Sequence, residues 1–252
     1  MRPISRVTIL SSTLIGSVVG CGSAAEYQEE NNNDSMETYD AAGAAGDYFG
    51  IIKDQRKCAS PTCGGWFLTR LNYSSTRCAD GTFAGSCYTP VLDWSAADLP
   101  GEDQLRMLRA CEDGASAGGT YAIVRGRFAR SNHTPDPSLG RFVISEAWLA
   151  EGDTVANGLF VRTTDNGIRC FAAPCPSITE EPLNGVHPTD IASIDWAPAD
   201  LTEGQIAECV AEMAKPDGLV VAGARYTVTG TAGSAPGRTA SAAFYRLTGE
   251  PR

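Results

Sequence analysis

The cysteines are the residues of this sequence whose spacing could carry chemistry. Two hexamers begin and end with cysteine, Cys58-Ala-Ser-Pro-Thr-Cys63 and Cys170-Phe-Ala-Ala-Pro-Cys175. Such pairs could exchange electrons, hold a metal ion or form structural disulfides. Redox-active dithiols usually have two intervening residues rather than four, and a structural zinc site needs four suitably spaced ligands. We therefore predict two local disulfides, Cys58–Cys63 and Cys170–Cys175.

Neither the histidines nor the acidic residues form a recognisable catalytic or metal motif. His133 and His187 each lie in a turn-rich stretch and supply too few ligands, so we interpret them as surface residues. The local motifs of nucleophilic hydrolases, phosphate-binding loops and zinc proteases do not occur. Four aspartates lie beside a tryptophan or before a predicted helix, and we interpret them as turn and capping residues rather than acid–base pairs: Asp93, Asp98, Asp195 and Asp200. We predict no catalytic residue, no metal site and no cofactor.

The N-terminal segment carries signals for export and anchoring. Residues 1–20 combine two arginines with an apolar run that ends in small residues, which is typical of a secretory signal and too short for a stable membrane span. The junction Val18-Val19-Gly20-Cys21 resembles the bacterial lipobox, in which the cysteine after the cleavage point carries lipid. Residues 21–47 would then be the lipidated cysteine and an acidic tether, disordered and with a reach of roughly 25–30 Å. By resemblance to bacterial lipoproteins, Gly22 rather than Asp at the position after the cysteine fits sorting to the outer membrane.

Similarity between two segments of the chain indicates an internal duplication. Leu71-Asn72 recurs 112 residues later as Leu183-Asn184, the same spacing that separates the two hexamers. The block Asp-Trp-Ser-Ala-Ala-Asp-Leu at 93–99 recurs with five identities at 195–201. We predict two tandem repeat domains of about 100 residues, a common domain size, at 48–150 and 158–250.

The repeats suggest partners for the remaining cysteines. Cys78 and Cys87 lie in an insertion of the first repeat around the turn signal Asp80-Gly81, which predicts a hairpin disulfide. Cys111 and Cys209 occupy equivalent places in two predicted helices. A Cys111–Cys209 bridge would lock the repeats together with about 4–5 kcal/mol in the chain-entropy model, and two buried thiols are the alternative.

Hydrophobic periodicity predicts mostly β structure with one helix in each repeat. We expect strands at 48–54, 66–72, 89–94, 120–130 and 141–149, then at 158–164, 178–184, 191–196, 218–229 and 239–247, with helices at 102–112 and 203–214. The order β-β-β-α-β-β is that of the OB-fold. We therefore predict an α+β, mostly β fold, each repeat being a disulfide-stapled small barrel or a curled sheet with one helix. Gly126 and Gly223 suit a bend in a curled strand, and Thr202 with Gln205 predicts a capping box.

The charge distribution argues against nucleic acid as a partner. The net charge of −10 disfavours ligands whose phosphates need a basic surface. Arg125 and Arg127 lie two residues apart on a predicted strand, with Arg130 and Arg141 nearby. Arg125 and Arg127 are candidate anion-binding residues, although charged residues on strands usually face water.

Part of the first repeat resembles a known protein family. The resemblance rests on these segments: KCASPTCGGW from Lys57 to Trp66, Leu71-Asn72, Cys78-Ala-Asp-Gly and Cys87-Tyr88. They resemble bacterial secreted lipoproteins that carry the domain of unknown function six-seven-four-eight. The resemblance is weaker in the second repeat, where Cys175 is followed by Pro-Ser. It implies an envelope location and disulfides, but no activity and no site residues.

These features together favour a bacterial lipoprotein that works as a non-enzymatic binding or structural module. It would contact the membrane through lipid on Cys21, with its folded domains in the periplasm or at the cell surface, and bind an unknown protein or small molecule. One alternative is an inhibitor of an extracellular hydrolase that uses a disulfide-closed loop with an apolar tip at Phe83, Phe171 or Trp66. Another is an enzyme of unrecognised type, with a pocket around Asp98, Asp200 and Arg127.

Overall fold

The computed structural model describes residues 46–130 and 137–249. The predicted signal segment, Cys21, nearly all of the tether and His133 lie outside these residues. The predicted tether extends one residue too far, because Asp47 already belongs to strand β1 (Asp47–Lys53) and forms an ion pair with Arg70. Among the described residues, no helix is long and apolar enough to cross a membrane.

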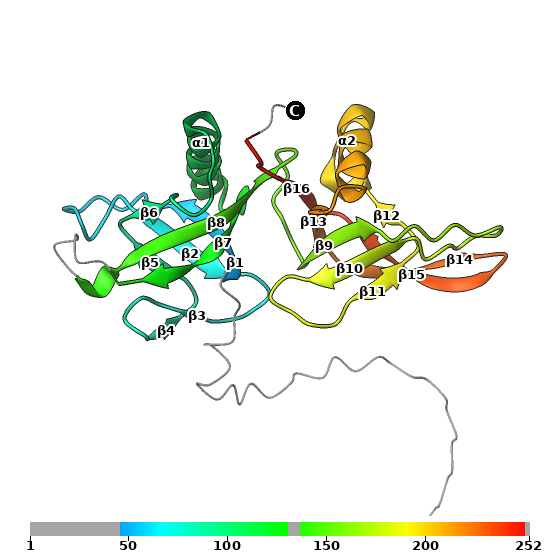
Figure 1. Cartoon of the computed structure of the whole chain (residues 1–252), viewed down its shortest axis with the longest axis horizontal. Helices are drawn as coiled ribbons and strands as arrows, with labels where there is room; N and C mark the ends of the chain where they lie inside the picture. The colour runs from blue at the N-terminus through cyan, green and yellow to red at the C-terminus, as the bar shows by residue number, and fades with distance from the viewer. Residues whose placement is uncertain (1–45, 131–136, 250–252) are drawn as a thin grey trace, which may run out of the picture. The chain divides into compact units, whose positions relative to one another are not determined.

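The fold is mostly β with two α-helices, as predicted (Figure 1). The first half, up to residue 150, contains β1, β2 (Trp66–Arg70), β3 (Thr76–Arg77), β4 (Phe83–Ala84), β5 (Cys87–Thr89), β6 (Leu92–Asp93), α1 (Gly101–Ala117), β7 (Ala122–Ala129), the 3₁₀ turn η1 (Pro137–Leu139) and β8 (Arg141–Ala150). The second half contains β9 (Leu159–Asp165), β10 (Ile178–Pro182), β11 (Thr189–Ile191), β12 (Ile194–Asp195), the 3₁₀ turn η2 (Ala197–Ala199), α2 (Glu203–Met213), β13 (Leu219–Gly223), β14 (Arg225–Gly230), β15 (Gly233–Thr239) and β16 (Ala242–Arg246).

The strands of the first half form a curled sheet. β1 lies antiparallel between β2 and β7, β2 pairs with β5, and β7 pairs with β8. β6 follows closely after β5 and pairs parallel with β8, which curls the sheet back toward its own edge. The predicted bend at Gly126 is confirmed by a register shift in β7. A Cβ there would lie 2.1 Å from the carbonyl oxygen of Val143, so the close approach requires glycine.

The second half has the same order of pairings with one interruption. β9 lies between β10 and β13, β10 pairs with β11, β13 pairs with β16, and β12 runs parallel to β15. Ala224 interrupts the strand between β13 and β14, and β12, β15 and β14 form a separate three-stranded sheet. An antiparallel β8–β16 pair joins both halves into one 11-stranded sheet. The sheets are open, so the curled sheet, rather than a closed barrel, is the observed form; duplication remains an interpretation.

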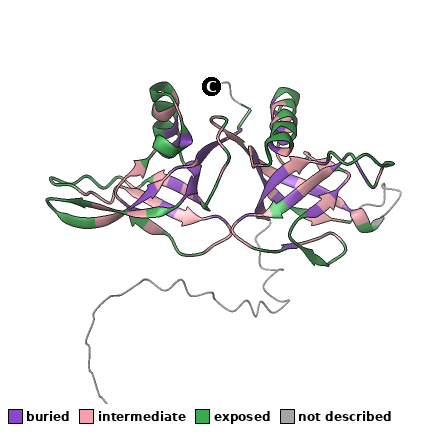
Figure 2. Ribbon diagram, turned by 180° about the vertical axis from the view of Figure 1, so that it is seen from behind, coloured by how far each residue is buried: buried purple, intermediate pink, exposed green. Residues whose placement is uncertain are grey.

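Each helix covers the strands of its own half. α1 packs on β1, β7 and β8, and α2 packs on β9, β13 and β16. Figure 2 shows buried residues along the central strands and exposed residues on the outward faces of the helices. The predicted capping box is confirmed, since Thr202 and Gln205 exchange side-chain and backbone hydrogen bonds at the start of α2. α1 runs past its predicted end to Gly118, whose φ of 70° terminates the helix.

Asn72, which follows β2, bonds the first half to the backbone of the second. Its side-chain nitrogen donates to the carbonyl oxygens of Phe160 and Leu183 at 2.7 and 2.9 Å. Its side-chain oxygen accepts from the Phe160 N–H at 2.9 Å. The residue has a φ of 66°, a conformation that asparagine tolerates better than most residues. One amide therefore satisfies three backbone groups of the other half.

Asn184, which follows β10, makes the reciprocal bonds. Its side-chain oxygen accepts from the Tyr48 N–H at 2.7 Å, and its side-chain nitrogen donates to the carbonyl oxygens of Tyr48 and Leu71 at 2.9 and 3.0 Å. Its φ is 60°. The two asparagines thus fix the junction from opposite sides.

We predict that Asn184→Ala lowers the free energy of unfolding by about 2–4 kcal/mol, because it strands backbone groups and places alanine at positive φ. Urea denaturation checks this. Asn184→Gly permits the positive φ but also lacks the side-chain amide, so it should show most of the same loss of stability. Asn157→Ala is the control, since Asn157 is exposed and is bonded through its backbone, and should change stability by less than about 0.5 kcal/mol. Equal stability of Asn184→Ala and Asn157→Ala would contradict the prediction.

At one set of equivalent core positions, the first half has apolar residues and the second half has charged residues. The strand registers place Glu180 where the first half has Leu68, and Arg238 where it has Phe142. In the first half, Phe142 lies edge-on to Phe128 with ring centroids 5.1 Å apart. This part of the first half is therefore an apolar, partly aromatic cluster.

In the second half the same positions hold a buried ion cluster. Glu180 and Arg238 are fully buried and form a bidentate pair with N–O distances of 2.5 and 2.9 Å. Arg238 also donates to the Gly223 carbonyl oxygen at 2.8 Å, and Arg225 donates to Glu180 at 2.6 Å. Each buried charge thus has a hydrogen-bonded partner, which burial in a low dielectric requires.

We predict that Glu180→Gln destabilises the fold by about 3–5 kcal/mol, because it leaves Arg238 buried without a countercharge. Converting the whole cluster to the residues of the first half, with Glu180→Leu, Arg225→Phe and Arg238→Phe together, should restore most of the lost stability. Urea denaturation measures both. Glu181→Gln is a matched control on the same strand, because Glu181 is in a solvent-exposed pair worth less than about 1 kcal/mol. A triple variant less stable than Glu180→Gln would contradict the prediction.

Candidate binding site

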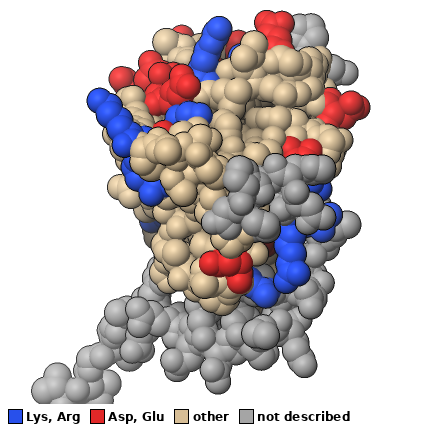
Figure 3. Space-filling model, turned by 90° about the vertical axis from the view of Figure 1, so that its left-hand side faces the viewer, with Lys and Arg blue, Asp and Glu red and all other residues tan. Residues whose placement is uncertain are grey.

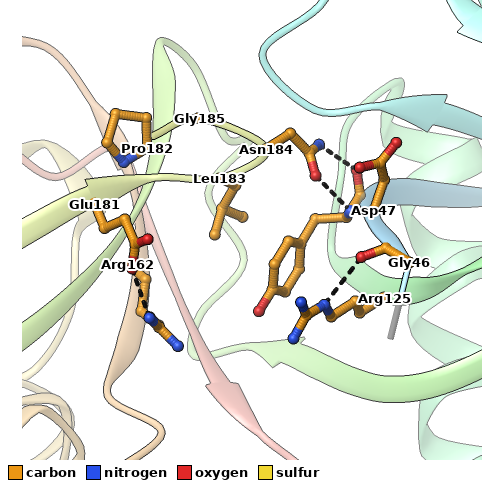
Figure 4. A pocket seen from close by; sticks show the side chains of 10 residues that line it. Gly46, Asp47, Arg125, Arg162, Glu181, Pro182, Leu183, Asn184 and Gly185 are labelled. Atoms are coloured by element: carbon orange, nitrogen blue, oxygen red, sulfur yellow. Dashed lines mark hydrogen bonds and ion pairs between the residues drawn. The ribbon is translucent and has the colours of Figure 1, made fainter. Parts of the chain in front are cut away.

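A pocket of about 250 Å³ lies at the junction of the two halves (Figure 4). The start of β1 and the middle of β7 line it from the first half, and β9, the end of β10 and the following turn line it from the second. Its lining residues are Gly46, Asp47, Tyr48, Arg125, Arg162, Glu181, Pro182, Leu183, Asn184 and Gly185. Because Asn184 bonds the Tyr48 backbone, the junction holds opposite walls of the pocket in place.

Arg125 dominates the wall that belongs to the first half. Its guanidinium donates to Glu146 at 3.0 Å and to the Gly46 carbonyl oxygen at 3.1 Å, and it lies 5.0 Å from the centre of the Tyr48 ring. Burial raises the pKa of Tyr48, and the nearby Glu146 carboxylate raises it further. The Tyr48 hydroxyl therefore stays protonated at neutral pH and donates to Glu146 at 3.4 Å.

Arg162 and Glu181 form the wall of the second half. The Arg162 guanidinium donates to the Glu181 carboxylate at 2.5 Å, and both side chains are partly exposed. Figure 4 shows this pair on the opposite side of the pocket from Arg125. One arginine from each half thus lines this small space, and each is paired with a carboxylate.

This arrangement suits binding of a small polar molecule. Each arginine is paired with a carboxylate, so the pocket carries little net charge. A guanidinium has five hydrogen-bond donors and a carboxylate has about four acceptor sites, so both groups can still bond to a ligand. A ligand with a positive and a negative group, such as an amino acid or a short peptide, would match such walls.

The two predicted anion-binding arginines do not share one site. Arg125 lines the junction pocket, whereas Arg127 lines a different hollow. The register shift between Arg125 and Gly126 separates them, because it interrupts the alternation of side chains along β7. Arg125 is paired with Glu146. Anion binding by either residue stays a prediction.

The recurring aspartates serve turns. Asp93 and Asp195 each accept a hydrogen bond from the backbone N–H two residues later, at 3.0 and 3.1 Å. Asp98 and Asp200 have φ of 50° and 52°, and neither lines the junction pocket or the hollow of Arg127. His187 is exposed in the turn after β10. Within residues 46–130 and 137–249, no cluster of three or more His, Cys, Asp or Glu could hold a metal ion.

Three of the predicted disulfides are present. Cys58–Cys63, Cys78–Cys87 and Cys170–Cys175 have Cα–Cα distances of 5.5, 5.3 and 5.5 Å, within the usual range. The structure therefore confirms local staples at both hexamers and at the inserted hairpin.

The loop of the first hexamer is fastened to the fold. Arg56 donates to both carboxylate oxygens of Asp54 at 3.0 Å and to the Thr62 carbonyl oxygen at 3.0 Å. The hydrogen bonds from the Arg56 side chain hold the pKa of Asp54 below its usual value. The Tyr88 hydroxyl donates to the Pro61 carbonyl oxygen at 2.7 Å. This loop is a braced part of the surface.

The loop of the second hexamer presents an apolar tip. Phe171 is fully exposed, and Ile168 just before the loop is also exposed. The loop is supported from below, since the Ala173 carbonyl oxygen accepts from the Ala232 N–H at 2.8 Å. Of the three proposed tips, Phe83 is exposed to a lesser degree and Trp66 packs against the core.

The predicted Cys111–Cys209 bridge is not present. Both cysteines are buried thiols that lie in the core. Each lies on a helix that packs on the strands of its own half, and Figure 1 shows the helices over different halves. A disulfide needs Cα atoms about 4.4–6.8 Å apart. The helical pattern correctly predicted inward-facing thiols, but it does not show that each points into its own half.

We predict that Cys111 resists alkylation in the folded protein, because burial raises the pKa of its thiol to about 12 and hides it from reagent. Mass spectrometry after iodoacetamide treatment should show Cys111 and Cys209 labelled only in denaturant, with the other six labelled only after reduction. A Cys111–Cys209 peptide in an unreduced digest would overturn this assignment.

Sequence reasoning missed most of the pocket residues. Tyr48, Arg162 and Glu181 lie on three different strands, and no local motif connects them. The recurring Leu-Asn pair was the available signal, because it marks the positions where the halves meet.

Comparisons with known proteins give a family and no activity. Searches of curated proteins and of solved structures found no match. One family model spans both halves, from residue 47 to residue 250. The chain therefore belongs to the family described as Domain of unknown function (DUF6748).

Proposed function

We propose that this protein is a lipid-anchored module of the bacterial cell envelope that works by binding a small polar ligand at the junction pocket. Three disulfides indicate an oxidising, extracytoplasmic compartment. The signal-like segment and the lipobox-like junction at Cys21 supply export and anchoring to the membrane, with Gly22 directing the protein to the outer membrane.

The junction pocket is the observation that carries the binding proposal. Its walls come from both halves, and reciprocal asparagine bonds fix those walls before a ligand arrives. Preformed walls reduce the entropy that binding must overcome. The arginines are neutralised, and Tyr48 is held protonated, so the pocket offers hydrogen bonds rather than an activated nucleophile or base.

A thermal-shift screen of free amino acids, dipeptides and monosaccharides tests the pocket. We expect at least one zwitterionic compound to raise the unfolding temperature, because a ligand that binds only the folded state stabilises it. Arg162→Gln should abolish the shift. Arg169→Gln should keep it, because Arg169 forms an exposed pair with Asp165 away from the pocket. A shift that survives Arg162→Gln, or no shift with any compound, would count against this site.

Fractionation of cells tests the anchor separately. The unaltered chain should be found in the membrane fraction after export, and Cys21→Ala should release it to the soluble extracytoplasmic fraction, because lipid supplies the membrane affinity. A chain with reduced thiols in the cytoplasm would contradict both export and anchoring.

Phe171 supports one second candidate, an inhibitor of an extracellular hydrolase. A fully exposed aromatic residue on a short disulfide-closed loop is a preorganised anchor for a partner's apolar pocket. Phe171→Ala should raise the inhibition constant against a susceptible hydrolase at least tenfold, with Phe83→Ala as the control. Equal inhibition by both variants would reject this loop.

A further inference from the structure

A second hollow of about 520 Å³ lies within the first half, between the end of β7 and the Cys78–Cys87 hairpin. Three arginines line it: Arg77 from β3, Arg127 near the end of β7 and Arg130 just after that strand. We call this hollow the arginine cleft. Arg127 and Arg130 are both exposed, and they come from a different element than Arg77, so the guanidinium groups face the hollow from two sides.

The two carboxylates that line the arginine cleft, Asp47 and Asp80, have other partners than Arg127 and Arg130. Asp47 forms an ion pair with Arg70 at 3.0 Å, and both side chains are mostly buried. Asp80 accepts hydrogen bonds from the backbone and hydroxyl of Thr82 at 2.9 and 2.7 Å. Among the residues that the structure describes, no carboxylate pairs with Arg127 or Arg130. A chain with a net charge of −10 therefore has a local excess of positive charge.

The hairpin wall of the cleft is built in advance. The Cys78–Cys87 disulfide closes it, and the Cys78 N–H donates to the Thr82 carbonyl oxygen at 2.8 Å. Ala79 lies against Gly140, where a Cβ would be only 2.6 Å from the Ala79 Cβ. The hairpin is thus packed onto the turn before β8, and Arg77 is held beside β7.

The second half has no counterpart of this wall. Its path from β10 to β11 covers six residues, without a cysteine pair. Figure 3, which faces the first half, shows basic and acidic side chains near one another on a largely uncharged surface, and not a general basic face. The three arginines that line the cleft are therefore a local feature of the first half.

We propose that the arginine cleft binds an oxyanion group of the phosphate type. Guanidinium groups donate paired hydrogen bonds that match phosphate oxygens, and several guanidiniums suit its double charge. The group could belong to free phosphate or to the head group of an anionic lipid. The arginine cleft shares Gly46 and Asp47 with the junction pocket, but Arg77, Arg127 and Arg130 do not line that pocket. Its ligand would be an anion, whereas the junction pocket suits a zwitterion.

Isothermal titration of the full chain carrying Cys21→Ala with inorganic phosphate tests the cleft. We expect saturable binding that weakens as sodium chloride is raised, because salt screens exposed charges. Arg127→Gln and Arg130→Gln should each weaken binding about tenfold or more, the loss typical of one charge-assisted hydrogen bond. Arg109→Gln, an exposed arginine on α1 outside the cleft, should leave the affinity unchanged.

Asp80→Asn is a variant for which we expect the opposite effect on phosphate affinity. It keeps an oxygen that can accept from Thr82 but removes a negative charge from the cleft, so it should tighten phosphate binding by about two- to fivefold. Circular dichroism confirms that each variant is folded. A weaker or unchanged affinity of Asp80→Asn would overturn the electrostatic basis of the proposal.

Vesicle flotation separates the two sources of the oxyanion. The same Cys21→Ala chain is mixed with phosphatidylcholine vesicles that contain or lack phosphatidylglycerol. Flotation only with phosphatidylglycerol, lost in the Arg127→Gln/Arg130→Gln double variant, assigns the cleft to lipid head groups. Phosphate binding without flotation assigns it to a free ligand. Absence of both, or binding that the double variant retains, overturns the proposal.

Discussion

Two asparagine side chains and one strand pair hold the halves of this domain together. Asn72 and Asn184 each satisfy backbone groups across the junction, while β8 and β16 pair edge to edge. Beneath them lies an apolar cluster drawn from both halves, including Trp148 and Phe244. Either half alone would expose this cluster, an open strand edge and unpaired backbone groups, all of which are costly. The junction pocket therefore depends on the same bonds that complete the fold.

Local patterns in the sequence predict local structure well. The helices, most strands, the capping box and the three staples depend on residues close in the chain, so spacing is enough to place them. The predicted strand 218–229 covers both β13 and most of β14, so the break between them was not predicted. β15 was missed because it is rich in Gly, Ser and Pro, which normally indicate a loop. The contacts that assemble the candidate site join residues far apart, such as Tyr48 and Asn184, and a single sequence does not pair them.

The ion cluster of the second half interrupts the apolar alternation of one strand. β10 carries Glu180 at a fully buried position, so its apolar alternation fails where the sheet is most enclosed. The first half has Leu68 there. The same backbone thus accepts an apolar cluster or an Arg–Glu–Arg cluster, provided that the whole set changes together. Hydrophobic periodicity detects the first solution and overlooks the second.

The order of the cysteines along the chain affects how the native disulfides can form. Under the proposed export, the chain is delivered from its N-terminus, so an oxidase meets the cysteines in sequence and tends to join neighbours as they emerge. The pairs 58–63 and 78–87 are neighbours, but the next cysteine, Cys111, would then meet Cys170. Native pairing requires Cys111 to be skipped. Cys111 lies on the buried face of α1, which packs on strands of its own half, so docking of that helix before Cys170 emerges would hide the thiol. Cys170 would then next meet Cys175, which is its partner in the folded protein.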